Sequence, residues 1–208
     1  MQVQCHTLGS LGTHCYFLIN ETTKEALVAD PADHADVITR KLQDQGLTLK
    51  GVLLTHGHAD HVLAVEELRE AHKVPVLAHE AEEKLLADPA QNLSYGIFRM
   101  RVSLEADQLL KDGEMVELAG FRLKVLHTPG HTPGGCCYYS EADGVLISGD
   151  TLFCASVGRT DFPGGSMSTL VRSIREKLLV LPDETKVYPG HSEMTTIGQE
   201  RRFNPYLA

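Results

Sequence analysis

Short apolar runs separated by turn-forming residues make up the first thirty positions, and they predict antiparallel strands. Further along, Val37, Ile38 and Leu42 recur at helical spacing, and a similar amphipathic pattern follows the apolar run 51–54. In this half the predicted strands are 3–8, 15–19, 26–29, 49–54 and 75–78, and the predicted helices are 35–45, 62–72 and 80–86. Residues 88–100 lack periodicity and predict a loop.

The second half repeats this plan of β-type runs followed by a helical pattern. Its predicted strands are 115–118, 121–126, 135–139, 145–147 and 185–188, and its predicted helix is 169–179. Two halves of this kind indicate two sheets packed face to face with helices outside. We therefore expect an α/β fold, a four-layer αββα sandwich, formed by one domain over residues 1–208.

Composition narrows the functional classes. Hydrophobic residues are 42% and charged residues 23%, which is typical of a globular protein, and the net charge of −9 disfavours binding to nucleic acid. We see neither an export signal nor an apolar stretch long enough to span a membrane, so we expect a cytoplasmic protein. The five cysteines form no C-x-x-C pair and are interpreted as reduced thiols, of which Cys154 lies close after a candidate ligand.

The strongest chemical signal is the segment 55–61, which follows a predicted strand. It holds His56, His58, Asp60 and His61 within six positions. His56 and His58 are two residues apart, so on an extended segment their rings leave the same side and can bind one ion. Imidazole and carboxylate ligands suit zinc, iron or manganese. The segment therefore predicts a transition-metal site.

Three further candidate ligands follow β-type runs, each beside glycine or proline: His131, Asp150 and His191. We expect His56, His58 and His131 to hold one ion. The second ion would be held by Asp60, His61 and His191. Asp150 would bridge the two ions, and a water shared between them would become a nucleophile at neutral pH. This arrangement predicts hydrolysis.

Several of these assignments have structural alternatives. His127 could replace His131 as a ligand, although we favour His131 and interpret His127 as a supporting residue. Asp150 could instead accept hydrogen bonds from turn amides. Asp30, at a strand end, is a candidate acceptor for the histidine segment. We interpret the other histidines as packing or surface residues: His6, His14, His34, His72 and His79.

Four motifs together resemble the metallo-β-lactamase superfamily, and within it the small glyoxalase II-like hydrolases. They are Thr-His-Gly-His-Ala-Asp-His (55–61), His-Thr-Pro-Gly-His-Thr (127–132), Ser-Gly-Asp-Thr-Leu-Phe (148–153) and Tyr-Pro-Gly-His (188–191). The resemblance implies the αββα fold, two divalent metal ions (Zn, Fe or Mn) and hydrolysis of a thioester such as S-D-lactoylglutathione by metal-bound hydroxide. It carries the ligand role onto the seven residues named above, the catalytic role onto Asp60 and Asp150, and substrate binding onto Arg159.

The chain also departs from glyoxalase II in ways that affect the expected substrate. That enzyme has a C-terminal helical domain for glutathione, which we do not expect here, and a tyrosine where this chain has Glu193. The sequence therefore supports a small-molecule thioester as the substrate more strongly than it supports glutathione as the thiol part of that substrate. Arg159 could equally pair with Asp161 of its own loop.

Two other readings remain open. A mononuclear iron persulfide dioxygenase has a similar histidine turn and would use His56, His131 and Asp150, and a hydrolase of another ester or lactone would use the same ligands. A metal-binding module without turnover is disfavoured by the full ligand set. The identity of the metals and the oligomeric state stay open.

Overall fold

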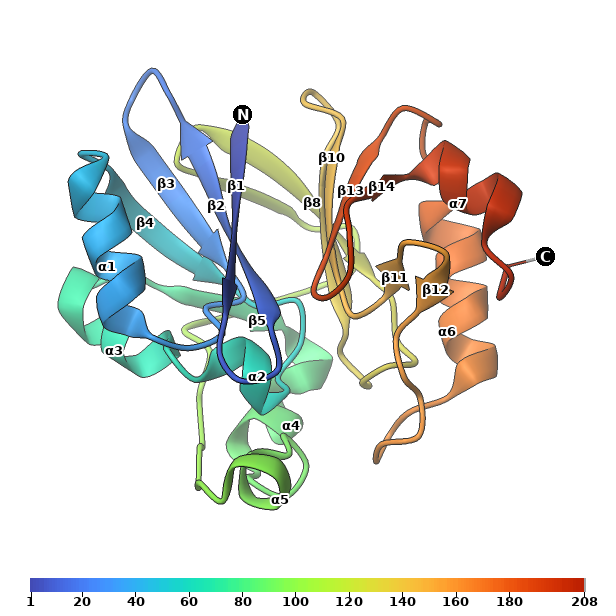
Figure 1. The fold of residues 1–208 in the computed structure, drawn as a ribbon, viewed down its shortest axis with the longest axis horizontal. Coiled ribbons are helices and arrows are strands. Elements are labelled where there is room, and N and C mark those ends of the chain that lie inside the picture. Colours follow the sequence, from blue (N-terminus) through green and yellow to red (C-terminus); the bar gives the residue numbers. More distant parts are fainter. Residues whose placement is uncertain (208) are drawn as a thin grey trace.

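Two six-stranded sheets lie face to face in the computed structural model, which describes residues 1–207 (Figure 1). The first sheet has the spatial order β1 (Gln2–Leu8), β2 (Thr13–Asn20), β3 (Glu25–Ala29), β4 (Thr48–Leu53), β5 (Val76–His79) and β6 (Gln108–Leu110). Its first three strands are antiparallel and the rest run parallel. The parallel part follows from the helices that connect these strands, as the alternating sequence pattern predicted.

The second sheet is mostly antiparallel and comes from the second half of the chain. Its order is β14 (Thr195–Thr196), β13 (Lys186–Pro189), β10 (Val145–Gly149), β9 (Cys136–Ser140), β8 (Phe121–His127) and β7 (Met115–Leu118). Only the pair formed by β10 and β13 is parallel, because a helix connects these two strands. A separate small ribbon consists of β11 (Leu152–Phe153) and β12 (Ser156–Val157).

Helices cover the outer face of each sheet. On the first sheet these are α1 (Ala35–Asp44) and α3 (Val65–His72), and on the second they are α6 (Met167–Ser173), the π-helical turn η2 (Ile174–Leu178) and α7 (Ile197–Phe203) (Figure 1). The short helices α2 (Ala59–Val62), η1 (Glu80–Glu82), α4 (Glu83–Ala87) and α5 (Ser94–Phe98) lie between strands of the first half. Among residues 1–207, we find no helix of the length and apolar character that crossing a bilayer requires.

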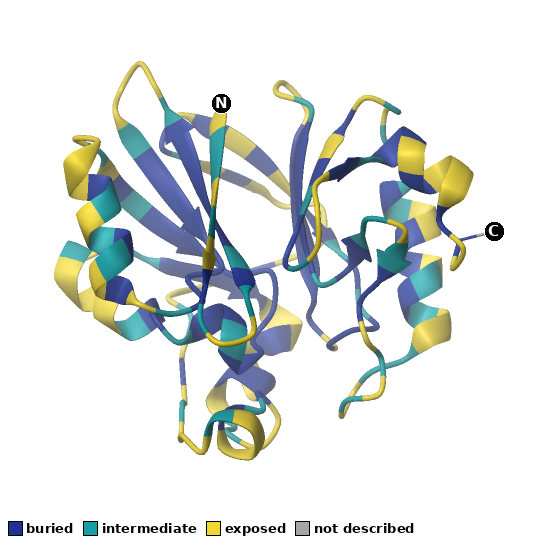
Figure 2. Ribbon diagram, in the orientation of Figure 1, coloured by how far each residue is buried: buried dark blue, intermediate teal, exposed yellow. Residues whose placement is uncertain are grey.

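Three apolar cores separate the four layers. One lies between the first sheet and its helices and includes Phe17 and Leu68, and the second lies between the two sheets and includes Leu53 and Tyr138. The third includes Leu170 and lies between the second sheet and its helices. Figure 2 shows the same division, with buried strands inside and exposed residues on the outer helix faces. The predicted αββα order is confirmed.

Some element boundaries differ from the sequence predictions. The helix predicted over 62–72 begins at Val65 as α3, and Val62 is instead the last residue of α2. The N–H of Ala64, between them, bonds to the carbonyl of Pro31. The loop predicted over 88–100 contains α5, a helix too short for periodicity to reveal. The short strands β6, β11, β12 and β14 and helix α7 were missed for the same reason.

Candidate metal centre

The histidine segment connects β4 to α2 and is anchored by a buried aspartate. Asp30, which follows β3, accepts the N–H of Thr55 at 2.8 Å and its hydroxyl at 2.6 Å. The other partner of Asp30 is the Nδ1–H of His61, at 3.0 Å from Oδ2. The Asp30 carboxylate orients the ring, so the Nε2 of His61 is the nitrogen directed away from Asp30. The expected acceptor role of Asp30 is therefore visible in the geometry.

His56, His58 and His131 bring their ring nitrogens together, and we call them the first triad. The Nε2 of His131 lies 2.9 Å from the Nδ1 of His58 and 3.3 Å from the Nε2 of His56. Because the Nδ1–H of His131 donates to the carbonyl of Arg159 at 2.7 Å, its Nε2 carries a lone pair in the neutral ring. Lone pairs of buried imidazoles thus converge on one point.

Asp60, His61 and His191 form the second triad. The Oδ2 of Asp60 lies 3.3 Å from the Nε2 of His191 and 3.5 Å from the Nε2 of His61. The hydroxyl of Thr13, on β2, donates to the same oxygen at 2.9 Å. This hydrogen bond holds the carboxylate toward the two rings.

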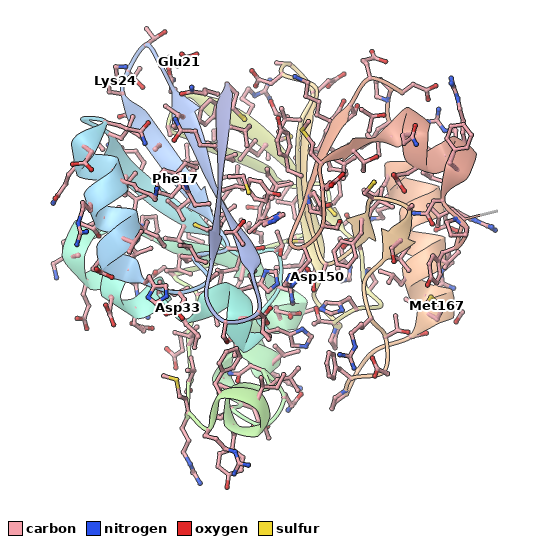
Figure 3. The ribbon with its side chains drawn as sticks, viewed as in Figure 1. Phe17, Glu21, Lys24, Asp33, Asp150 and Met167 are labelled. Atoms are coloured by element: carbon pink, nitrogen blue, oxygen red, sulfur yellow. The ribbon has the colours of Figure 1, made fainter. Side chains whose placement is uncertain are left out.

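Asp150, which follows β10, lies between the two triads, and Figure 3 labels it at the lower end of the interface between the sheets. Its Oδ2 is 3.6 Å from the Nε2 of His131 and 3.7 Å from the Nε2 of His191. Its Oδ1 is 3.5 Å from the Nε2 of His61. One carboxylate therefore faces donor atoms of both triads.

The donor set fits transition-metal ions. Bonds of about 2.1 Å in a tetrahedral arrangement separate the donor atoms by about 3.4 Å, which is the scale of the distances above. The buried Nε2 of His61 and Oδ1 of Asp150 have no hydrogen-bond partner among residues 1–207. Because an unsatisfied buried polar atom is costly, these two atoms support a cation site.

Electrostatics in the cluster also favour cations. Burial, together with His131, lowers the pKa of His58 to about 3, so this ring is a neutral donor at physiological pH. Burial opposes the charging of His61 as well, but the carboxylates of Asp60, Asp150 and Asp30 raise its pKa to about 10. Three carboxylates around one ring give the site an excess of negative charge that divalent ions would balance.

The sequence model of the metallo-β-lactamase superfamily matches residues 8–191, which includes every candidate ligand. The chain belongs to the metallo-β-lactamase superfamily. Among curated relatives, the hydroxyacylglutathione hydrolase GloC of Haemophilus influenzae is 39% identical over 192 residues. The alignment covers 91% of this chain and 91% of GloC. The chain is accordingly a metal-dependent hydrolase of the superfamily.

Solved structures of the superfamily superpose along nearly the whole chain. BLEG-1 B3 metallo-β-lactamase has a TM-score of 0.95 at 40% identity, with 100% of both chains covered. TTHA1623, crystallised in a di-iron-bound form, has a TM-score of 0.88 at 36% identity, covering 99% of this chain and 100% of that one. ETHE1 from Myxococcus xanthus has a TM-score of 0.82 at 30% identity, covering 99% and 84% respectively.

Three other residues considered in the sequence analysis lie outside the two triads. His127 lies outside the cluster, where its ring stacks on His79 at 3.9 Å and its Nε2–H donates to the carbonyl of Pro133. Cys154 is half-buried in the turn between β11 and β12, and Glu193 is exposed. The ring that meets His56 and His58 is thus His131, the residue we favoured.

Arg159 lies at the edge of the site with its charge already paired. Its Nη2 and Nε bond to the carboxylate of Asp161 at 2.7 and 3.0 Å. The guanidinium also lies 4.3 Å from the ring centroid of Phe162, and that ring in turn meets the His58 ring edge-on at 5.4 Å. The backbone of Arg159 contributes more directly, because its carbonyl orients His131.

Some supporting residues escaped sequence reasoning altogether. Besides Thr13, the hydroxyl of Tyr16 donates to the carbonyl of Pro189 at 2.7 Å, and the N–H of His14 donates to the carbonyl of Gly190. Strand β2 therefore braces the loop that carries His191. No local pattern marks these residues, since their partners are more than 40 positions away in the chain.

Gly190→Ala tests how tightly this superfamily site is packed. An added Cβ would lie 2.3 Å from the Oδ1 of Asp150 and 2.7 Å from the Cε1 of His61, so both side chains must shift. We expect metal affinity to fall by about tenfold or more, measured by titration of the metal-free protein. Gly96→Ala is the matched control, because a Cβ there has nothing within 4 Å. Equal affinity in both variants would contradict the geometry described above.

Proposed function

We propose that the protein is a glyoxalase II-like thioester hydrolase that uses two divalent metal ions. The observation that carries this proposal is the position of Asp150, whose two oxygens face His61 on one side and His131 on the other. The first triad would hold one ion and the second triad the other. Support comes also from the similarity to GloC, a hydroxyacylglutathione hydrolase, and to a protein crystallised with two irons.

Divalent ions held by the two triads would supply Lewis acidity and would lower the pKa of a bound water toward about 7. The protein's own contribution is orientation, because Asp30 and the carbonyl of Arg159 fix the tautomers of His61 and His131. The reaction adds water across the bond between the acyl carbon and sulfur, and yields a carboxylic acid and a thiol. Asp60 and Asp150 are the carboxylates placed to accept the proton from the attacking water. A thiolate leaves readily, so no strong general acid is needed.

Steady-state assays on metal-loaded protein test the proposed activity. Thiol release from S-D-lactoylglutathione and from a simpler acyl thioester should be measurable and should depend on added Zn, Mn or Fe. The two substrates together separate thioester chemistry from recognition of glutathione. The proposal fails if protein containing two ions per chain hydrolyses neither of them.

Arg159 is proposed to contact the substrate from its place beside Phe162. Arg159→Ala should raise KM several-fold with little change in kcat, because it removes binding shared by the ground and transition states. Arg122→Ala is the control, since Arg122 forms a similarly exposed pair with Glu117 away from the metal cluster. If the two variants have the same KM, Arg159 serves only to pair with Asp161.

Two other activities have specific support. The similarity to BLEG-1, a B3 metallo-β-lactamase, favours hydrolysis of a β-lactam, so nitrocefin belongs in the assay panel together with a lactone. The persulfide dioxygenase reading would need only one iron, held by His56, His131 and Asp150. Oxygen uptake with glutathione persulfide, set against thiol release, distinguishes it from the hydrolase. Asp60→Ala adds a second criterion, because only the two-ion enzyme needs that carboxylate as a ligand.

A further inference from the structure

A fully buried carboxylate lies beside the first triad without belonging to it. Glu82, in η1, has no exposed surface. Its Oε1 accepts the N–H of Gly57 at 3.0 Å, and its Oε2 accepts the N–H of Gly134 at 2.6 Å. Each oxygen is thus committed to a backbone donor on a different loop.

These two donors belong to the loops that carry the first triad. Gly57 is the residue between His56 and His58, and Gly134 is three residues after His131 in the loop from β8 to β9. The loops extend from opposite sheets and are also joined at their base by a hydrogen bond from the N–H of Cys136 to the carbonyl of Thr55. Glu82 adds a second link between the two loops, through Gly57 and Gly134.

The segment around Glu82 fits against the His131 loop with little spare room. A Cβ added at Gly134 would lie 2.3 Å from the backbone nitrogen of Glu82 and 2.5 Å from its Oε2. Residue His79, next to the same segment, also stacks on His127 at the end of β8, where this loop begins. The loop is therefore seated on residues 79–82 at two points.

We infer that Glu82 is a positioning residue that holds the two ligand loops at the separation needed for the three nitrogens of the first triad to bind one ion. The inference rests on the metal site proposed above. A carboxylate suits this task because both of its oxygens accept hydrogen bonds. Glutamine has a single acceptor oxygen, so its NH2 group would oppose the N–H of either Gly57 or Gly134.

The energetics of Glu82 also point beyond packing. Burial raises the pKa of Glu82 to about 7, and the hydrogen bonds from the N–H groups of Gly57 and Gly134 only partly oppose that shift. An apolar side chain would fill the same space without the cost of burying an ionisable group. Retaining a carboxylate here gives the loops two fixed hydrogen bonds that no apolar residue provides.

Glu82→Gln tests the inference, with Glu200→Gln as the matched control. Glu200 is equally buried, and its hydrogen-bond donors Ala155, Thr195 and Asn204 all lie outside the two loops of the first triad. Metal-free proteins are titrated with Co²⁺ by calorimetry, and their unfolding temperatures are measured without metal. We expect Glu82→Gln to weaken one of two binding events about 10- to 100-fold, and Glu200→Gln to leave both unchanged.

The cobalt spectrum identifies which ion is affected. At one equivalent of Co²⁺, the spectrum of Glu82→Gln should match that of His131→Ala, because the second triad would be the tighter site in both variants. Loss of thermal stability with both affinities intact would show a purely structural role and overturn the inference. If Glu82→Gln does not fold, Glu82→Asp keeps the charge but is one methylene too short to reach both amides. Unchanged affinity in that variant would overturn the inference equally.

These outcomes are distinct from failure of the proposed function. A wild-type chain that binds no Co²⁺ would refute the two-ion hydrolase itself. A wild-type chain that binds two ions, beside a Glu82→Gln variant that binds them equally well, would refute only the role of Glu82.

Discussion

Asp150→Ala is expected to lower kcat/KM for a thioester by about a thousandfold, which corresponds to about 4 kcal/mol of transition-state stabilisation. Asp150 has oxygen atoms within 3.7 Å of donor atoms in both triads. Removing it takes an oxygen donor from each proposed ion at once. Bound metal should also fall below two ions per chain, as measured by elemental analysis.

Two further variants make this result interpretable. Asp150→Asn keeps the shape but cannot offer two anionic oxygens, so it should lose nearly as much activity as Asp150→Ala. Asp44→Ala removes an exposed carboxylate at the end of α1 and should leave both activity and metal content unchanged. Full activity in Asp150→Ala would mean that the aspartate only bonds to its own turn, the alternative reading of the sequence.

The candidate metal ligands could be predicted from the sequence because most of them lie close together along the chain. Four of the seven candidate ligands lie within positions 56–61, and the others follow β-type runs beside glycine or proline. Strand ends in a layered α/β fold meet at a common edge, so the sequence alone assigns these separate motifs to one site. The structure brings all seven side chains to that edge.

The residues that hold the candidate ligands in place could not be predicted in this way. Glu82 lies in the predicted helix 80–86, and Thr13 lies between the predicted strands 3–8 and 15–19. Each acquires its role from a partner more than 40 residues away, Gly134 and Asp60 respectively. Propensity and periodicity describe neighbours along the chain, and therefore say nothing about such long-range hydrogen bonds.

Arg159 is a case in which the sequence predicts a local contact but cannot decide whether the residue also binds the substrate. Sequence reasoning gave equal weight to a substrate contact and to a pair with Asp161, two residues away. The structure contains the pair with Asp161 and in addition stacks the guanidinium on Phe162. An exposed ion pair can break when a ligand binds to one of its members, and this depends on the ligand. The kinetic comparison of Arg159→Ala with Arg122→Ala therefore decides whether Arg159 binds the substrate.

Removal of metal should have the second large effect, on stability as well as on activity. An ion present at about a thousand times its dissociation constant stabilises the folded chain by about 4 kcal/mol, because the unfolded chain has no preformed site. For a chain of 208 residues this corresponds to a fall of about 8 to 16 °C in unfolding temperature on chelation. The physical cause is that three carboxylates, those of Asp30, Asp60 and Asp150, lie together beside His61, and divalent ions would balance their negative charge.

Thermal unfolding followed by circular dichroism, with and without a chelator, measures this effect. Adding back Zn, Mn or Fe should restore both the unfolding temperature and turnover, and the most effective metal indicates which ion the site prefers. His131→Ala is the internal control, because a chain with one ligand set incomplete should show a smaller shift on chelation. If the unfolding temperature is the same before chelation, after chelation and after metal is added back, ions do not stabilise the folded chain. The two-ion site would then have to be rejected.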